Sequence, residues 1–230
     1  MTAPHLVLHQ HPFASFCQKA VIALYELDLP FETALIDGPE AHAEMVALWP
    51  TGKMPVLRDD GVDATVGEST TVIEYADGIA AGGPRLVPAD PGAALTVRMW
   101  DRFFDHYVQV PMQKVVADAL RPEGSEDPFG VAEARETLDA SYVTLDDRLA
   151  GIPWAAGDAF SMADCAAAPA LFYARIVHPW DEAARPHLTR YYRDLVHRPS
   201  VLRSIDDARP FRGVFPLPWP DDADAHQPAR

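Results

Sequence analysis

The first eighty residues alternate between apolar positions spaced by two and apolar positions spaced by three or four. Short apolar runs predict strands at 5–9, 31–36, 56–58 and 64–66. Helical spacing predicts helices at 15–28, 40–48 and 69–80. Leu29-Pro30 ends the first helix, and Asp59-Asp60-Gly61 marks the turn between the last two strands. This order of elements predicts a compact α/β unit.

From about residue 92 the apolar spacing is helical throughout. The first helix of this half carries an apolar stripe at i, i+3, i+4, i+7 and i+8, formed by Trp100, Phe103, Phe104, Tyr107 and Val108. We expect Pro111 to kink this long helix. Further helices are predicted from apolar positions within 131–149, 161–176 and 191–196. The second half of the chain therefore predicts an all-α domain.

Gly, Pro and Asp cluster between the predicted elements and indicate the domain boundaries. The expected organisation is an α/β domain over 1–82, a linker over 83–91, an all-helical domain over 92–213 and an irregular acidic tail over 214–230.

The composition is that of an ordinary globular protein, with 48% hydrophobic and 23% charged residues in a chain of 230. No apolar run approaches the roughly 20 residues that a membrane-spanning helix needs. The start MTAPHLVLHQHP has no positively charged region and no long apolar segment, so we expect no secretory signal and a cytoplasmic location. Cys17 and Cys165 show neither metal-ligand spacing nor a paired framework, which fits a reducing compartment.

Acidic residues outnumber basic ones, 34 against 19, and give a formal net charge of −15. Such a field repels phosphate backbones and anionic lipid surfaces, so we expect neither nucleic acid nor a membrane surface as a partner. The pair His9 and His11 has no third ligand nearby, so we expect no metal site.

The segment Lys53-Met54-Pro55-Val56-Leu57 places a proline at the first residue of a predicted strand. If the Met54–Pro55 bond is cis, the backbone N–H and C=O of Met54 face outward and pair with an extended, peptide-like ligand. The alternative is an ordinary trans proline that opens an edge strand.

Glu68-Ser69 comes directly before a predicted helix. With Ser69 as the N-cap, the free N–H groups and the positive end of the helix dipole favour a bound carboxylate, and Glu68 pairs with an ammonium group. Together they form a receptor for the head of an amino acid. The alternative is simple capping beside a solvated glutamate. Lys53 either reaches a second carboxylate of the same ligand or is a solvated lysine.

Ser15 stands at the start of the first predicted helix. A hydroxyl there donates a hydrogen bond to an anion, and the helix dipole stabilises the charge, so the pKa of a bound thiol falls. Helix capping explains the serine equally well. Cys17 is a second candidate nucleophile, but a Cys-x-x-Cys redox site needs cysteine at position 14, which is Ala14.

These features together resemble the glutathione S-transferase superfamily. The proline turn, the Glu68-Ser69 pair and the serine-bearing first helix match its N-terminal half. The segment Ala156-Gly157-Asp158-Ala159-Phe160-Ser161-Met162-Ala163-Asp164 is similar to the capping box and hydrophobic staple of its C-terminal half. The resemblance covers about residues 5–213. It implies a thioredoxin-like N-terminal domain that binds glutathione and an all-α C-terminal domain that shapes the site for an electrophile.

The resemblance also assigns roles to the glutathione-binding candidates. Met54, after the Pro55 turn, pairs with the cysteinyl backbone of glutathione. Glu68 and Ser69 hold the γ-glutamyl end, and Lys53 holds the glycine carboxylate. The implied co-substrate is glutathione, with no metal.

The resemblance makes Ser15 the hydroxyl that stabilises the thiolate. In many serine-type members this hydroxyl lies five residues before the basic residue matching Lys19, which here is Ala14, and in others it lies four before, which is Ser15.

The pocket for the second substrate is expected between the Ser15 end and the long helix, at Phe104, Tyr107, Val108 and Met112. The alternative for each is plain packing in the core. The function implied is conjugation of the glutathione thiolate to a small hydrophobic electrophile by a homodimer. The alternatives are a glutathione-dependent isomerase or peroxidase on the same scaffold, and a non-catalytic binding protein.

Overall fold

A computed structural model describes residues 5–83 and 85–228. Four strands form one mixed sheet in the order β2-β1-β3-β4. The strands are β1 (Leu6–Gln10), β2 (Glu32–Leu35), β3 (Val56–Asp59) and β4 (Ala64–Gly67). β2 runs parallel to β1, while β3 is antiparallel to both of its neighbours, β1 and β4. β1 and β2 are parallel because a crossover helix connects them. β3 and β4 are antiparallel because a tight turn connects them.

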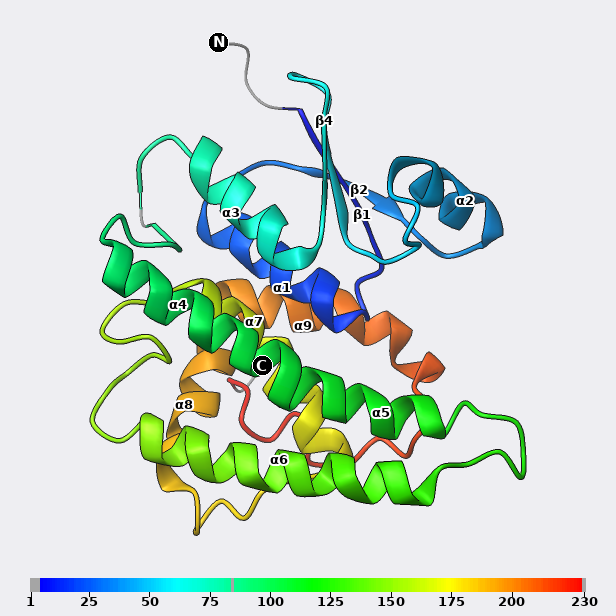
Figure 1. Cartoon of the computed structure of the whole chain (residues 1–230), viewed down its shortest axis with the longest axis vertical. Helices are drawn as coiled ribbons and strands as arrows, with labels where there is room; N and C mark the ends of the chain where they lie inside the picture. The colour runs from blue at the N-terminus through cyan, green and yellow to red at the C-terminus, as the bar shows by residue number, and fades with distance from the viewer. Residues whose placement is uncertain (1–4, 84, 229–230) are drawn as a thin grey trace.

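Alternation along the strands divides the sheet into two packed faces (Figure 1). Leu57 joins the main core with α1 (Ser15–Glu26) and α3 (Ser69–Ile79), whereas Val56 points to the other face. There Val56 packs with Met45 of α2 (Pro39–Leu48) in a smaller cluster. The sheet is therefore covered by helices on both sides, with α1 and α3 between it and the C-terminal helices.

The C-terminal half is a bundle built around α7 (Met162–Val177), which is buried along nearly its whole length. α1 and the long helices α4 (Pro91–Phe103) and α5 (Val110–Asp118) pack against it. The remaining helices are α6 (Pro128–Arg148), α8 (Pro186–His197) and α9 (Pro199–Ala208), followed by a short 3₁₀ segment, Arg209–Val214. The predicted architecture, an α/β half followed by an all-α half, is confirmed.

The predicted long helix is interrupted just before Pro111. α4 and α5 are joined by a π-helical segment, Phe104–Gln109. Pro111 has no N–H to offer the carbonyl of Tyr107 four residues earlier, and the Ser141 hydroxyl donates to that carbonyl instead, at 2.9 Å. The π turn rotates the side chains that follow, so Tyr107 is 54% exposed while Gln109 is buried. Where the sequence predicted a kink at Pro111, the structure has a π-helical segment directly before it.

The predicted capping box at the start of α7 is present. Asp164 accepts hydrogen bonds from the backbone N–H and the hydroxyl of Ser161, at 2.8 and 2.9 Å. Its other oxygen accepts from the Ala155 N–H and from the Tyr191 hydroxyl. Burial raises the pKa of Asp164, and these hydrogen bonds oppose the rise. The carboxyl therefore joins α7, α8 and the preceding loop.

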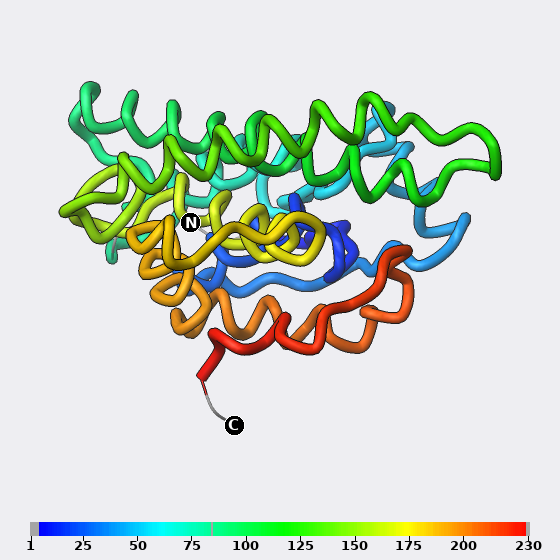
Figure 2. The backbone as a smooth tube through the Cα atoms, turned by 90° about the horizontal axis from the view of Figure 1, so that it is seen from below, coloured from blue at the N-terminus to red at the C-terminus, as the bar shows by residue number. Residues whose placement is uncertain are grey.

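The acidic tail has no helix or strand over 215–228, but it is docked on the helices (Figure 2). Asp224 accepts from Arg209 and Arg212. Burial by itself raises the pKa of Asp224, but the hydrogen bonds from the two arginines lower it to about 2. Trp219 lies against Phe215 and under the Arg212 guanidinium. Residues 229–230 of the expected tail lie outside the described residues.

Candidate functional site

A cavity of about 460 Å³ opens where the first helix, the proline turn and the third helix begin. Its lining includes every residue that the sequence assigned to glutathione binding or catalysis, namely Ser15, Lys53, Met54, Pro55, Glu68 and Ser69. These residues come from three segments spread over more than fifty positions of the chain. The fold brings them together because the N-terminal ends of α1 and α3 lie beside the start of β3.

The Met54–Pro55 peptide bond is cis. Within residues 5–83 and 85–228, neither the N–H nor the C=O of Met54 forms a hydrogen bond. A backbone with an unused donor and acceptor at a cavity wall is available to pair with an extended chain. Lys53, exposed next to it, is the cation among the residues that line this cavity.

The start of α3 differs in one detail from the sequence interpretation. Ser69 is the first residue of the helix and not its N-cap, which is Glu68. Glu68 has φ = 66°, a left-handed conformation that a non-glycine residue adopts at a cost of roughly 1–3 kcal/mol. Among the described residues no side chain caps this helix end, so its first N–H groups remain available at the cavity wall. The helix end is therefore ready to receive a carboxylate.

Ser15 lines the cavity and is only 7% exposed. The side-chain amide of Gln109, at the end of the π-helical segment, donates a hydrogen bond to the Ser15 oxygen. A serine oxygen that already accepts a hydrogen bond keeps its own proton for donation elsewhere. Gln109 is 2% exposed, and sequence reasoning missed it because it lies outside the predicted apolar stripe.

Cys17 does not reach this cavity. It is fully buried in α1, and burial raises the pKa of its thiol to about 12. A thiol that stays protonated at neutral pH is a poor nucleophile, which argues against the redox interpretation. Ala14 lines the cavity beside Ser15 and brings no hydroxyl to it.

Lys19 is buried behind Ser15 in a cluster of charges. Its ammonium group lies 2.7 Å from Asp101 and 2.8 Å from Asp105, and it donates to Thr70 at 2.9 Å. Arg102 also contacts both carboxylates. Burial raises the pKa of Asp105, and the Lys19 charge opposes this. The cluster ties α1 to α3, α4 and the π-helical segment, and so fixes Ser15 relative to the start of α3.

Replacing Lys19 with methionine is expected to lower the free energy of unfolding by about 3 kcal/mol. The two buried carboxylates lose their buried counter-charge and keep only the half-exposed Arg102. Urea denaturation followed by circular dichroism measures the change. Lys114→Met is the control, since its partly exposed pair with Asp127 predicts a change of about 1 kcal/mol or less. Equal losses in the two variants would contradict a structural role for the buried cluster.

A second cavity, of about 190 Å³, adjoins the first and shares Ala14, Ser15 and Gln113 with it. Its other lining residues are mostly apolar, namely Phe13, Met112, Val116, Leu120, Tyr173, Val214, Phe215 and Pro216. It lies between the start of α1, the α5 helix and the beginning of the tail. An apolar cavity that meets a polar one at a single hydroxyl is suited to a reaction between two unlike molecules.

The lining of this second cavity corrects the sequence expectation. Met112 lines it, but Phe104 and Val108 are fully buried in the core. Tyr107 is 54% exposed and packs against Phe103, away from the cavity. The π turn and the packing of Phe104 and Val108 in the core account for these positions. Phe13, Tyr173 and Phe215 line the cavity from other segments, and no helical periodicity marks them.

Two family profiles match the sequence. One is "Glutathione S-transferase, N-terminal domain", over residues 8–84, and the other is "Glutathione S-transferase, C-terminal domain", over residues 128–194. The chain belongs to the glutathione S-transferase superfamily.

Curated relatives agree with this assignment. Glutathione S-transferase GstB of Escherichia coli K12 is 29% identical over 195 residues, which cover 82% of this chain and 91% of that protein. Glutathione S-transferase 3 of Zea mays is 29% identical over 229 residues, 96% of this chain and 99% of that protein. These relatives support an enzyme of this superfamily.

Solved structures share the fold. The glutathione S-transferase of Methylobacillus flagellatus with glutathione bound superposes with a TM-score of 0.79 at 24% identity, covering 86% of this chain and 98% of that one. The enzyme of Sinorhizobium meliloti superposes with a TM-score of 0.81 at 23% identity, covering 96% and 99%. The fold is thus a thioredoxin-like domain followed by an all-α domain.

The described residues were also compared with the requirements of a metal site and of a membrane-spanning helix. Among the described residues, no group of three or more His, Cys, Asp or Glu side chains is arranged to hold a metal ion. In the same part of the chain, no helix has the length and apolar character required to cross a membrane.

Proposed function

We propose that this protein is a glutathione transferase that joins the sulfur of glutathione to a small apolar electrophile. The observation that carries the proposal is the position of Ser15, at the junction of the polar cavity and the apolar cavity. A group at that junction touches both the thiol held on one side and the acceptor held on the other.

The polar cavity fits an extended tripeptide with a carboxylate at each end. The Met54 backbone pairs with the cysteinyl residue, and the N–H groups at the start of α3 receive the γ-glutamyl carboxylate. Glu68 binds the γ-glutamyl ammonium group. Lys53 binds the glycine carboxylate, in a protein whose overall charge of −15 otherwise repels anions.

Catalysis then depends on holding the thiol ionised and close to the acceptor. The thiol proton leaves to solvent, and Ser15 donates its hydroxyl proton as a hydrogen bond to the resulting thiolate. A hydrogen bond to a charged group contributes about 1.5–3 kcal/mol, which lowers the thiol pKa by about one to two units. The sulfur lone pair forms the new C–S bond while the electrophile's leaving group departs with the electrons of the broken bond.

Titration calorimetry with glutathione tests the binding half of this proposal. We expect Glu68→Gln to weaken binding about tenfold, because the ammonium group loses its charged partner. Glu74→Gln is the matched control, since Glu74 lies on the same helix and pairs with Arg98 outside the cavity. Unchanged affinity in both Glu68→Gln and Ser69→Ala would place glutathione elsewhere.

Turnover assays separate the reaction types. Conjugation predicts that the protein releases chloride from a dinitrophenyl chloride in the presence of glutathione. Retention on immobilised glutathione without any turnover favours a binding protein. Turnover of a hydroperoxide or of an isomerisable substrate, with the chloride untouched, favours the isomerase or peroxidase alternative.

We propose that the protein acts as a homodimer in the cytoplasm. Several large apolar side chains are about half or more exposed along α4, the π-helical segment and the start of α5, namely Leu95, Met99, Tyr107 and Val110. Such a row of exposed apolar groups on a soluble domain fits a protein interface. The thiols of Cys17 and Cys165 are free, which fits a reducing compartment.

The change Leu95→Glu is expected to shift the protein from dimer to monomer, because it places a carboxylate in the apolar row. Sedimentation velocity measures the mass. Leu120→Glu is the control, since Leu120 is similarly exposed but lies just beyond the C-terminal end of α5. A monomeric parent protein, or a dimer unaffected by Leu95→Glu, would refute this interface.

A further inference from the structure

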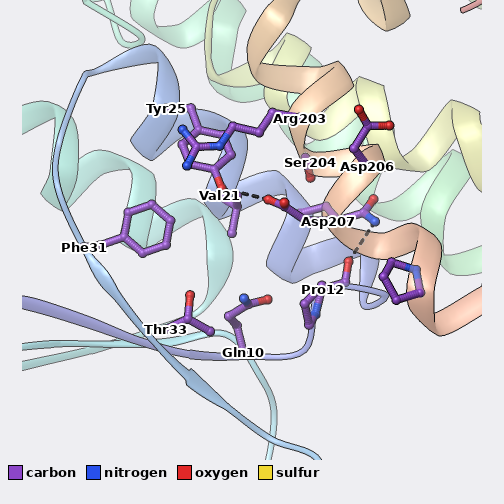
Figure 3. A pocket seen from close by; sticks show the side chains of 12 residues that line it. Gln10, Pro12, Val21, Tyr25, Phe31, Thr33, Arg203, Ser204, Asp206 and Asp207 are labelled. Carbon is purple, nitrogen blue, oxygen red and sulfur yellow. Dashed lines mark hydrogen bonds between the residues drawn. The ribbon is translucent and has the colours of Figure 1, made fainter. Parts of the chain in front are cut away.

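A second groove lies apart from the two cavities of the proposed active site. It is bounded by the end of β1, the edge strand β2, one side of α1 and the middle and end of α9. Its main pocket has a volume of about 470 Å³ (Figure 3). None of its lining residues also lines the polar or the apolar cavity. This volume lies in the range of small-molecule sites. Nothing in the proposed conjugation reaction uses this groove.

The floor of the groove contains an unsatisfied polar group. Gln10, at the end of β1, is 5% exposed, and its side-chain oxygen has no hydrogen-bond partner within the described residues. Its amide is directed toward the groove between Pro12 and Thr33 (Figure 3). Buried polar groups in folded proteins nearly always have a partner, so an unpaired acceptor here favours a ligand with a hydrogen-bond donor.

Aromatic side chains form one wall. The rings of Tyr25 and Phe31 lie 5.7 Å apart at an angle of 39°, and Val21 adds an apolar surface beside them. The Arg203 guanidinium covers the Tyr25 ring at 4.0 Å. Phe31 is only partly buried and extends from the edge of the sheet toward the groove (Figure 3). This wall fits a flat aromatic ring.

The charges around the groove favour a cation. Asp28, Asp206 and Asp207 line the main pocket and its extension along α1, together with one arginine, Arg203. Asp206 pairs with Arg209 at 2.8 Å, so the excess negative charge at the groove comes from Asp28 and Asp207. Asp207 accepts the Tyr25 hydroxyl at 2.9 Å and remains exposed to the groove. The net charge of −15 on the whole chain adds to this preference.

We propose that this groove is a binding site for a small aromatic amine. The ring of the ligand lies against Phe31, beside the Tyr25 ring that Arg203 covers. The protonated amine donates to the Gln10 side-chain oxygen and the Asp207 carboxylate. The site is independent of the glutathione cavity, so a ligand here occupies the protein together with glutathione.

Titration calorimetry with three indoles of similar shape tests the proposal. Tryptamine carries an ammonium group, skatole is neutral and indoleacetate is an anion. We expect tryptamine to bind at least tenfold more tightly than indoleacetate, with skatole between them. Saturating S-hexylglutathione, which occupies both cavities of the proposed active site, is expected to leave tryptamine binding unchanged.

Two variants locate the site. Asp207→Asn keeps an oxygen that accepts the Tyr25 hydroxyl and removes the charge, so we expect tryptamine to bind about tenfold more weakly and to lose its advantage over skatole. Phe31→Ala is expected to weaken all three indoles. Asp194→Asn, an exposed aspartate on α8, is the matched control and is expected to bind tryptamine like the parent.

Several outcomes would overturn the proposal. These are an absence of tryptamine binding to the parent protein, displacement of tryptamine by S-hexylglutathione, and parent-like binding in both Asp207→Asn and Phe31→Ala. Glutathione titrations on the same variants keep the two sites apart. Asp207→Asn is expected to bind glutathione normally, so failure of the groove proposal leaves the glutathione site untouched.

Discussion

Replacing Ser15 with alanine is expected to lower kcat/KM for conjugation between about tenfold and a hundredfold at neutral pH. The loss corresponds to one hydrogen bond to a charged sulfur, about 1.5–3 kcal/mol. Because this bond stabilises the ionised thiol, its removal raises the pKa of bound glutathione by about one to two units. The pH profile of kcat/KM therefore shifts to higher pH, and activity recovers in alkaline solution.

A ligand without an ionisable thiol separates this effect from simple loss of binding. The affinity for S-hexylglutathione is expected to stay within about twofold of the parent value in Ser15→Ala. Ser204→Ala removes another buried serine hydroxyl, on α9, and is expected to leave the pH profile unchanged. An unshifted profile in Ser15→Ala, together with a gain of turnover in Ala14→Ser, would assign the thiolate contact to position 14.

Replacing Gln109 with glutamate is expected to have an effect at least as large as the loss of Ser15. Gln109 is a positioning residue, because it acts through its hydrogen bond to the Ser15 oxygen. A carboxylate in its place accepts a hydrogen bond from the Ser15 hydroxyl. The hydroxyl then no longer donates its hydrogen bond to the thiolate. The added negative charge, in a nearly buried position, also opposes a second anion nearby. We expect kcat/KM at neutral pH to fall about a hundredfold, with the pH profile again shifted upward.

A double-mutant cycle shows whether Gln109 acts through Ser15. Gln109→Leu keeps the approximate shape and removes the donor, and we expect it to lower kcat several-fold with little change in the KM for glutathione. In the Ser15→Ala background the same change is expected to cost less than about twofold, because the group that it orients is already absent. Equal losses in both backgrounds would indicate a purely structural role for Gln109.

The backbone features of the proposed binding side could be predicted because their signals are local. Pro55 at the start of a strand and Glu68-Ser69 at the start of a helix each imply unused backbone groups, whatever the rest of the chain does. The structure places both at one cavity. The N-cap was assigned one residue too late, because the left-handed backbone of Glu68 has no signature in the side-chain pattern.

The apolar side of the site was predicted less well. The stripe from Trp100 to Val108 showed which helix face is apolar, but an apolar face packs equally well against a core or around a cavity. Phe104 and Val108 lie in the core, and the π turn leaves Tyr107 exposed and outside the apolar face. The aromatic residues that line the cavity with Met112 come instead from just before α1, from α7 and from the tail.

The sequence alone determined the order of the elements in the α/β half, the division into an α/β half and a helical half, and the capping box at Ser161. Hydrophobic spacing and helix-end chemistry act over a few neighbouring residues. The sequence did not predict α9 (Pro199–Ala208) or the break between α4 and α5. Only the tertiary structure decided that Gln109 contacts Ser15 and that Lys19 is held between two aspartates. The same holds for the buried side-chain oxygen of Gln10, which has no hydrogen-bond partner among the residues that the structure describes. Each of these contacts depends on how helices distant in the chain pack together. Periodicity tells which face of a helix is buried and leaves open which partner it meets.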